Sequence, residues 1–223
     1  MRPKVKICGL MREDDVRMCV HHGADIVGFV VDYPRPVPWN LNVQSVKKLM
    51  RIVSGQSKTC IVTGGTSDKV IKLILETQPD YVQLHFGENL VDTGHIVNET
   101  KKYGVKIIKT LFPNTPNLEK VAVDFCMAGV YALLVDSRTP DNAVFGGKAD
   151  LTTFIKLRDV VECPVILAGG INPGNVAEII KKTGAEAIDL MTGVEQYPGI
   201  KDESKVISLF KALSLRCNPI ATD

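Results

Sequence analysis

The sequence predicts an α/β protein folded as a single (β/α)8 barrel, or TIM barrel, over residues 1–223. Short runs of β-branched residues alternate with longer segments of helical periodicity from one end of the chain to the other. This alternation is typical of a parallel sheet with right-handed crossovers, and eight such units in 223 residues fit a closed barrel. A doubly wound open sheet is the alternative. The count of eight and the unbroken composition favour the barrel.

Eight apolar runs are predicted to be strands, and a predicted helix follows each of them. The predicted strands are 4–8, 25–31, 59–63, 81–85, 106–111, 130–136, 164–168 and 186–190. The predicted helices are 12–22, 42–53, 67–77, 89–102, 116–127, 151–159, 173–183 and 202–214. Gly23, Gly104 and Gly184 mark helix ends, because glycine readily adopts the left-handed conformation found there. Asn172 followed by Pro173 predicts the N-cap and first turn of the seventh helix.

The composition is that of an ordinary folded protein and indicates no charged macromolecular partner. Hydrophobic residues make up 45% of the chain, charged residues 23%, and the net charge is +2. This balance gives no reason to expect nucleic acid or a membrane as a partner. Apolar runs such as 26–31 and 130–135 are much shorter than the roughly 20 residues of a membrane span. Because the chain enters its first strand without an apolar signal region, we expect a cytoplasmic protein.

The cysteines are scattered and include no C-x-x-C pair. They are Cys8, Cys19, Cys60, Cys126, Cys163 and Cys217. The scatter does not resemble a set of zinc ligands, and a chain of this length does not depend on disulfides. We therefore expect most of them to be small buried residues in a reducing compartment, and we expect no metal site.

The barrel explains the alternation in KVKICGL, residues 4–10. The outward faces of barrel strands meet the helices and are apolar, whereas the inward faces can carry polar groups near the mouth. Val5 and Ile7 are therefore predicted to face the helices, and Lys6 and Cys8 the interior. By the same alternation, the inward residues of the fourth and eighth strands are Tyr81, Gln83, His85 and Asp189.

Catalytic groups in such barrels lie where the strands end and in the loops that follow. Of the six cysteines, only Cys8 lies at such an end, and the same rule retains Asp32, His85, Lys109 and Asp136. Cys8 is either a buried structural thiol or a thiol that Lys6 helps to ionise.

Two other candidate residues also have two interpretations each. Asp136 ends a wholly apolar run, so burial would raise the pKa of its carboxyl and suit it to act as an acid. The alternative is a turn residue ahead of the next loop. Arg35 lies in YPRPVPWN, a loop stiffened by three prolines, which could present its guanidinium to a carboxylate or phosphate or leave it solvated. His85 fits a local hydrogen bond better than it fits chemistry.

Two glycine-containing loops indicate a phosphate site. LAGGINPGNV (167–176) follows the seventh strand and precedes a helix, and LMTGVE (190–195) follows the eighth strand. Glycines let backbone amides approach an anion closely, and the dipole of a helix favours negative charge at its N-terminus. Phosphate commonly binds in the loops after strands seven and eight of a barrel. The presence of glycines in both loops therefore favours a phosphate site over the alternative that the glycines only form tight turns.

Several longer stretches match a known family. They are KICGLMREDDVRMCVHHGADIVGFV, PRPV, VQLH, LLVDS, PVILAGGINPGNVAEII and DLMTGVEQYPGIKDESKV. Together they resemble the phosphoribosylanthranilate isomerases of tryptophan biosynthesis over essentially the whole chain. The resemblance implies an Amadori rearrangement of N-(5-phosphoribosyl)anthranilate, an aminoaldose, to 1-(2-carboxyphenylamino)-1-deoxyribulose 5-phosphate. It also implies a small phosphosugar substrate and no metal or organic cofactor.

The resemblance also implies roles for individual residues. Cys8 matches the general base and Asp136 the general acid. The acid would protonate the ribose ring oxygen to open the ring, and the base would remove the C2 proton of the resulting Schiff base. Arg35 matches the arginine that contacts the anthranilate carboxylate. The other predicted substrate contacts are Lys6, Gln83, His85 and Asp189, and the predicted phosphate ligands are Gly146, Gly147, Gly169, Gly170, Thr192 and Gly193.

The sequence departs from the family pattern at four places around the barrel mouth. These are the loop with Lys148 and Ala149 after Gly146 and Gly147, the stretch IVTGGTSD, the extra Phe86, and Met191 and Thr192 in place of a serine pair. Because such positions select the substrate, two alternatives stay open. One is a paralogous barrel enzyme acting on another phosphosugar, and the other is a non-catalytic barrel that binds a phosphate ligand. The sequence is compatible with a monomer or a homodimer.

Overall fold

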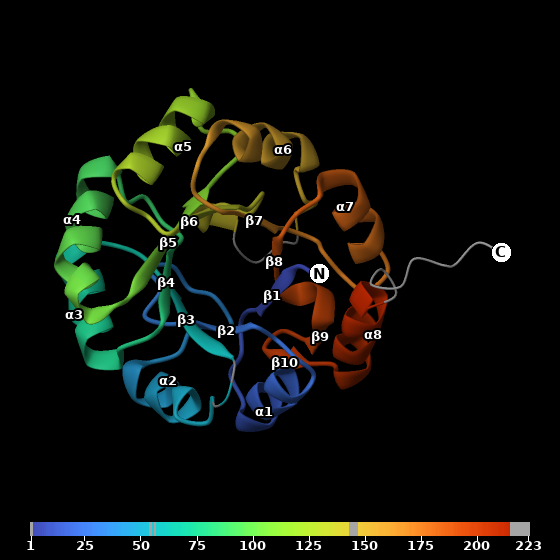
Figure 1. Cartoon of the computed structure of the whole chain (residues 1–223). Helices are drawn as coiled ribbons and strands as arrows, with labels where there is room; N and C mark the ends of the chain where they lie inside the picture. The colour runs from blue at the N-terminus through green and yellow to red at the C-terminus, as the bar shows by residue number, and fades with distance from the viewer. Residues whose placement is uncertain (1, 54, 56, 143–146, 215–223) are drawn as a thin grey trace.

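The eight strands form a closed parallel barrel, with helices around its outside (Figure 1). The computed structural model describes residues 2–53, 55, 57–142 and 147–214. The barrel strands are β1 (Lys4–Ile7), β2 (Ile26–Val30), β3 (Lys58–Thr63), β4 (Tyr81–Leu84), β5 (Lys106–Leu111), β6 (Ala132–Val135), β7 (Val165–Ala168) and β8 (Ala187–Leu190). The helices are α1 (Glu13–His21), α2 (Val43–Met50), α3 (Ser67–Thr77), α4 (Leu90–Thr100), α5 (Leu118–Met127), α6 (Leu151–Val160), α7 (Val176–Thr183) and α8 (Glu203–Ser214). The predicted barrel is confirmed.

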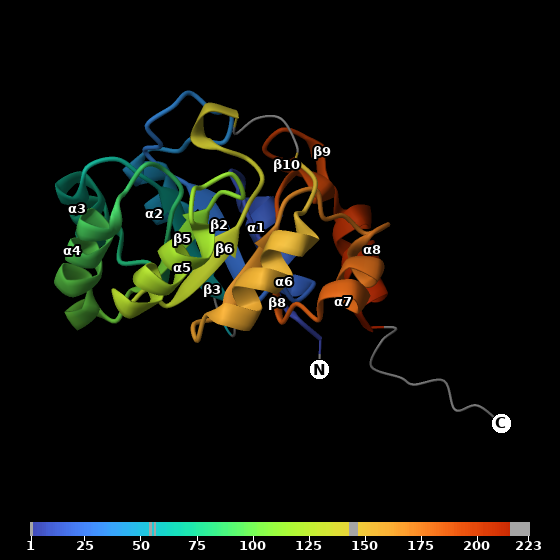
Figure 2. The same cartoon turned by 90° about the horizontal axis from the view of Figure 1, so that it is seen from above.

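The loops that follow the strands gather at one end of the barrel. Figure 2 shows the start of the chain at one end and the loop after β2, together with the short 3-10 helix η2 (Pro140–Asn142), at the opposite end. Arg35 and Asp141 join these two loops through a hydrogen bond of 3.0 Å between Nη2 and Oδ1. This end, where the strands finish, is the mouth of the barrel.

The barrel has an apolar outer layer and a divided interior. Val5 and Ile7 are fully buried in the cluster that includes the inner faces of the helices, which confirms their predicted direction. A second apolar cluster comprises Cys60, Tyr81, Ile108, Ala132, Leu134, Ile166 and Ala168. A third cluster, with Cys8, Val30, Tyr33, Trp39 and Val62, lies at the mouth. Polar side chains between these clusters therefore stand inside a largely apolar barrel.

The barrel closes where β1 pairs with β8. Their register places Lys6 opposite Asp189 and Ile7 opposite Leu190. Since side chains alternate along a strand, Lys6 and Asp189 both point inward at this seam, as predicted.

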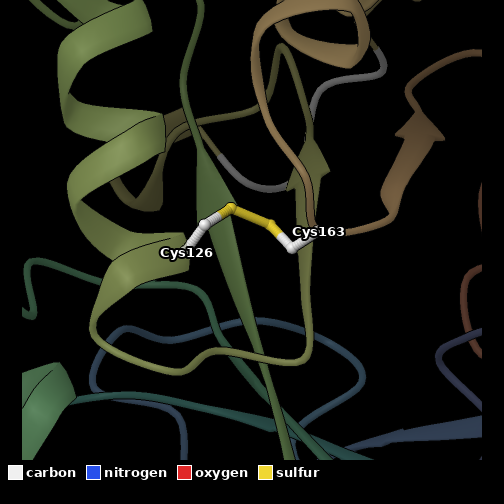
Figure 3. Close-up of a disulfide and its surroundings, with 2 residues drawn as sticks. All are labelled: Cys126 and Cys163. Carbon is white, nitrogen blue, oxygen red and sulfur yellow. A yellow bond between two sulfur atoms is a disulfide. The ribbon is translucent and has the colours of Figure 1, made fainter.

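Cys126 and Cys163 form a disulfide, and for these two residues the expectation of most cysteines as small buried residues in a reducing compartment is wrong (Figure 3). Cys126 lies near the end of α5, and Cys163 lies just before β7. The two segments meet because β6 and β7 are neighbours in the barrel and their connections run along the same edge. Cys8, Cys19 and Cys60 are free and buried, while Cys217 lies outside the described residues.

Some element boundaries differ from the predicted ones. Helix α7 starts at Val176, three residues later than predicted, after a turn in which the amides of Asn175 and Val176 both donate to the carbonyl of Asn172. A short antiparallel hairpin of β9 (Glu195–Tyr197) and β10 (Ile200–Lys201) follows the 3-10 helix η3 (Thr192–Val194), and the sequence did not predict it. A further 3-10 helix, η1 (Lys101–Tyr103), ends at Gly104, which adopts φ 73°. None of the helices in the described ranges has the length and apolar character that a membrane span requires.

Candidate active site

A small pocket lies at the barrel mouth and brings five of the predicted site residues together. Its lining comprises Cys8, Val30, Tyr33, Val37, Trp39, Val62, Gln83, His85, Asp136, Arg138, Asp189 and Met191. The void between these side chains measures about 40 Å³, which is room for about two or three water molecules.

Cys8 directly follows β1 and faces Gly28 of β2. A methyl group at Gly28 would lie 2.9 Å from the Cys8 sulfur, so the glycine makes room for the thiol. Burial raises the pKa of the Cys8 thiol, and the attraction of Lys6 offsets this only in part. The expectation that Lys6 ionises the thiol is thus not met by this arrangement. Cys8 is protonated at neutral pH.

Asp136 follows β6 and is 1% exposed. The guanidinium of Arg138 donates hydrogen bonds to the Asp136 carboxylate. Arg138 Nη2 lies 2.9 Å from Asp136 Oδ2, and Arg138 Nε lies 3.2 Å from each carboxylate oxygen. The backbone amide of Arg138 donates to Oδ1 as well, at 3.0 Å. Burial alone would raise the pKa of Asp136, but His85 and Arg138 outweigh burial and hold the pKa well below its usual range. The predicted direction of this shift is therefore wrong, and the carboxyl is ionised.

His85 connects Asp136 to Tyr33. Its Nε2 lies 3.8 Å from Asp136 Oδ2, which is beyond hydrogen-bond distance. On the other side of the ring, Nδ1 lies 2.9 Å from the oxygen of the Tyr33 hydroxyl, and this hydroxyl donates to the His85 carbonyl at 2.8 Å. The local hydrogen bonds expected for His85 are confirmed. The histidine is fixed in place beside the acid.

Beneath the pocket, a polar layer crosses the barrel interior. Lys6 Nζ donates to Asp189 Oδ2 and to Gln83 Oε1, both at 2.9 Å. Gln83 in turn donates to the Thr110 hydroxyl at 3.2 Å. Burial opposes the charge on Lys6, but Asp189 outweighs it and raises the pKa of the ammonium. Gln83 and Asp189 reach the pocket, whereas Lys6 lies behind them.

Three sequence candidates lie apart from this pocket. Arg35 has a side chain 55% exposed and pairs with Asp141. Asp32 is also exposed and lies 3.5 Å from Lys69, which bridges the loops after β2 and β3. Lys109 is buried in an ion pair of 2.8 Å with Glu88.

Glu88 is a residue that the sequence reading missed. Its Oε1 accepts from the amide of Gly65, and its Oε2 accepts from the amide of Phe86 and from Lys109. Two of the places at which the sequence departs from the family pattern, IVTGGTSD and Phe86, are therefore joined to each other through Glu88.

Glycines let the loops after β6, β7 and β8 touch through their backbones. A side chain on Gly170 would overlap the carbonyl oxygen of Gly147, and one on Gly193 would overlap that of Ile171. Gly169 and Gly170 also adopt φ values of 96° and 60°, which favour glycine. Thr192 begins η3, and Gly146 lies outside the described residues.

Trp39 ties the loop after β2 to the loops after β8. Its indole N–H donates to Glu195 Oε1 at 2.9 Å, and the same oxygen accepts from Lys201 at 2.9 Å and from the amide of Gly199 at 3.1 Å. The contact between Trp39 and Glu195 joins segments 156 residues apart, so no local pattern reveals it. Within the described residues, no cluster of His, Cys, Asp and Glu could hold a metal ion.

Fold and pocket define a class: a (β/α)8 barrel with a thiol and a carboxyl in the lining of one pocket at the ends of its strands. The profile of the family described as N-(5'phosphoribosyl)anthranilate (PRA) isomerase matches residues 5–212. The chain belongs to the N-(5'-phosphoribosyl)anthranilate isomerase family.

Individual relatives agree with this assignment. The chain is 33% identical over 216 residues to the N-(5'-phosphoribosyl)anthranilate isomerase of Rhodopseudomonas palustris (strain BisB5), covering 93% of this chain and 94% of the relative. It is 31% identical over 224 residues to the enzyme of Halobacterium salinarum, covering 98% and 99%. The crystal structure of the Thermotoga maritima isomerase is similar with a TM-score of 0.81 and 25% identity, covering 95% of this chain and 98% of that one.

Proposed function

We propose that the chain catalyses the isomerisation of N-(5-phosphoribosyl)anthranilate to 1-(2-carboxyphenylamino)-1-deoxyribulose 5-phosphate in tryptophan biosynthesis. The observation that carries the proposal is that Cys8 and Asp136 line one pocket in a barrel of the family named for this reaction. A solved structure with 24% identity and a TM-score of 0.78, covering 95% of this chain and 98% of that one, is described as an isomerase in complex with the reduced product. This supports a small phosphosugar as the substrate.

The rearrangement needs one acid and one base on the same sugar. Asp136 would protonate the ring oxygen and so open the ribose ring, which leaves a protonated Schiff base at C1. Cys8 would then remove the proton from C2. The positive charge of the Schiff base lies next to C2, and a cation near a thiol favours its ionised form. The protonated Schiff base therefore favours ionisation of the Cys8 thiol, which then removes the C2 proton of the same Schiff base.

The phosphate would bind among the glycine loops. A free side-chain donor supports this position: the Ser137 hydroxyl is buried and has no hydrogen-bond partner among the described residues. It lies against Gly147, and a methyl group at Gly169 would come within 3.1 Å of it. A buried hydroxyl without a partner is costly, and an acceptor such as a phosphate oxygen would satisfy it.

The direct test is turnover by the purified protein and its variants. We expect the wild type to convert N-(5-phosphoribosyl)anthranilate, and the loss of anthranilate-type fluorescence measures this conversion. In Cys8→Ala and in Asp136→Ala, kcat should fall about 100- to 10,000-fold. Cys60→Ala is the matched control, since Cys60 is also free and buried but does not line the pocket.

Two results would contradict the proposal. One is wild-type turnover in Cys8→Ala. The other is failure to complement a tryptophan auxotroph that lacks the isomerase while phosphate still binds, which would favour a paralogous barrel with another phosphosugar substrate. The cytoplasmic location and the choice between monomer and homodimer stay predictions.

A further inference from the structure

Trp39 is the largest apolar side chain in the lining of the pocket, and a hydrogen bond and close packing fix its position. The indole is 2% exposed, and its N–H donates to Glu195 Oε1 at 2.9 Å. Its Cδ1 edge packs against glycine backbone, because a methyl group would lie 3.1 Å from Cδ1 if added at Gly9 and 3.8 Å from it if added at Gly199. The indole therefore presents a firmly held aromatic surface to the pocket.

The apolar part of the lining suits the aromatic ring of the proposed substrate. Besides Trp39 it comprises Val30, Val37, Val62 and Met191, all of which belong to the cluster at the mouth. An aromatic ring beside an indole gains more than the area it buries, through offset stacking or an edge contact. A ring that enters the pocket is therefore expected to lie against Trp39, and the phosphate at the other end of the substrate would lie among the glycine loops.

The carboxylate that holds the indole belongs to the phosphate end of the site. Glu195 directly follows η3, which contains Thr192 and Gly193, two of the predicted phosphate ligands. Lys201 Nζ donates to the carbonyl of Met191 at 3.3 Å and to Glu195 Oε1 at 2.9 Å, so one ammonium contacts the residues on both sides of η3. The side chains of Lys201 and Glu195 are 0% and 5% exposed. Charge-assisted hydrogen bonds of this kind are strong, so a change in η3 reaches Glu195 and, through it, the indole.

Another tie of the loop after β2 provides a comparison. Arg35 and Asp141 pair at 3.0 Å, but their side chains are 55% and 79% exposed. Solvent screens an exposed pair and leaves it little energy. The tie from Trp39 to Glu195 is shielded from solvent, and it is the one that leads to η3.

We propose that Glu195 and Lys201 couple the two ends of the substrate: phosphate bound at η3 fixes Glu195, Glu195 fixes Trp39, and the aromatic ring then binds to an indole that is already in place. This inference rests on the proposed function and adds positioning residues to it. The ligand that binds first orders η3 and the indole, so the second ligand binds more tightly. Linkage makes the effect mutual, and the ring strengthens phosphate binding by the same factor. Without such a link, two anionic ligands in one site would weaken each other.

Two separate ligands test the coupling without turnover. They are inorganic phosphate and anthranilate, which represent the two ends of the substrate. The fluorescence anisotropy of anthranilate gives its Kd in every variant, because the measurement does not use tryptophan. At constant ionic strength in chloride, saturating phosphate should lower the Kd of anthranilate about 5- to 50-fold in the wild type, and the reciprocal titration should give the same factor.

Three variants locate the link. Trp39→Phe keeps an aromatic ring but has no N–H to donate to Glu195, and its coupling should fall below about twofold. Glu195→Gln/Lys201→Met removes both charges at once, which leaves no buried ion unpaired, and should also lose the coupling because it releases η3. Asp141→Asn is the matched control: it breaks the exposed tie of the same loop and should keep the coupling of the wild type. Thermal unfolding and the affinity for phosphate alone show whether a variant is folded; if Trp39→Phe is not, the double variant carries the test.

Fluorine NMR of the indole gives a second readout. The chain has a single tryptophan, so incorporation of fluorotryptophan yields one signal, from Trp39. Phosphate alone should shift or narrow this signal in the wild type and leave it unchanged in Glu195→Gln/Lys201→Met. A merely structural hydrogen bond would hold the indole equally with and without phosphate, and the signal would then respond in neither protein.

The outcomes separate this inference from the proposed function. If phosphate and anthranilate both bind the wild type but neither changes the Kd of the other, the coupling is absent and the isomerase remains. Coupling that persists in Trp39→Phe or in the double variant, or that disappears in Asp141→Asn, also overturns the assignment. If the wild type binds neither ligand and turns over no substrate, the proposed function fails, and this inference fails with it.

Discussion

Lys6 and Asp189 form a buried ion pair across the seam at which the barrel closes. They are register partners on β1 and β8, and Nζ lies 2.9 Å from Oδ2. The side chains are 1% and 4% exposed. A buried pair of this kind contributes little net stability compared with an apolar pair, but its partners depend strongly on each other.

Replacing one member of this pair should therefore be costly. We expect Asp189→Asn to lower the free energy of unfolding by about 3–5 kcal/mol, because it leaves a buried ammonium without a counter-charge. Urea unfolding followed by circular dichroism measures the change. Glu178→Gln, which breaks the exposed pair with Lys182, is the control and should leave the midpoint unchanged. Equal midpoints for the two variants would show that Lys6 does not need Asp189.

The pH dependence of kcat/KM should be flat across neutral pH. The proposed mechanism needs Cys8 ionised and Asp136 protonated, but burial raises the pKa of Cys8, and His85 and Arg138 lower that of Asp136. Between the two pKa values, raising the pH by one unit increases the fraction of Cys8 thiolate tenfold and decreases the fraction of protonated Asp136 tenfold. The product of the two fractions is therefore constant, from about pH 5 to pH 8.

Initial rates at low substrate concentration in constant ionic strength measure this profile. A tenfold rise per pH unit in that range would mean that Asp136 is not the required acid, and a tenfold fall would mean that Cys8 is not the required base. Cys60→Ala should reproduce the flat profile of the wild type.

The disulfide should stabilise the fold without affecting the reaction. It joins Cys126 and Cys163, which are 37 positions apart, and closing a loop of that size is worth about 2–4 kcal/mol. We expect dithiothreitol to lower the urea midpoint of the wild type and to leave that of a Cys126→Ser/Cys163→Ser double variant unchanged. The activity at 25 °C should stay the same, because the bridge lies by the start of β7, at the end of the barrel opposite the mouth. A midpoint that does not respond to reduction would contradict the assignment.

Gly193→Ala should weaken phosphate binding. The added methyl group would overlap the carbonyl of Ile171, so the loops after β7 and β8 would have to separate. Losing one or two charge-assisted hydrogen bonds to the phosphate should reduce affinity about 10- to 100-fold. Inorganic phosphate as a competitive inhibitor provides the measurement. Gly94→Ala, where the methyl group would meet nothing within 4 Å, should bind phosphate as the wild type does.

Strand directions could be predicted because they follow from local alternation. Lys6 and Cys8 point inward because Val5 and Ile7 must meet the helices, and this needs no knowledge of distant residues. The hairpin of β9 and β10 could not be predicted, because its strands have only three and two residues. These are too few for an alternation of apolar and polar residues to be recognised.

The charge state of the site could not be predicted from the sequence. The pKa of Asp136 depends on Arg138, two residues along, and on His85 from another strand. From the sequence alone, only the burial of Asp136 can be predicted, and burial raises its pKa. In the folded chain, His85 and Arg138 lower this pKa by more than burial raises it. Likewise, the disulfide depends on the meeting of the end of α5 with the segment before β7, which only the closed barrel brings about.

Trp39 is the chain's single tryptophan, and its indole lines the pocket while Glu195 holds its N–H. An anthranilate ring absorbs in the near ultraviolet, where indole emits, so a ligand in the pocket would draw excitation energy from this one fluorophore. The chain thereby carries its own optical probe at the mouth of the barrel. Quenching of Trp39 in a rapid-mixing instrument would time the arrival of the substrate separately from its conversion, most clearly in Cys8→Ala, where conversion is slowed.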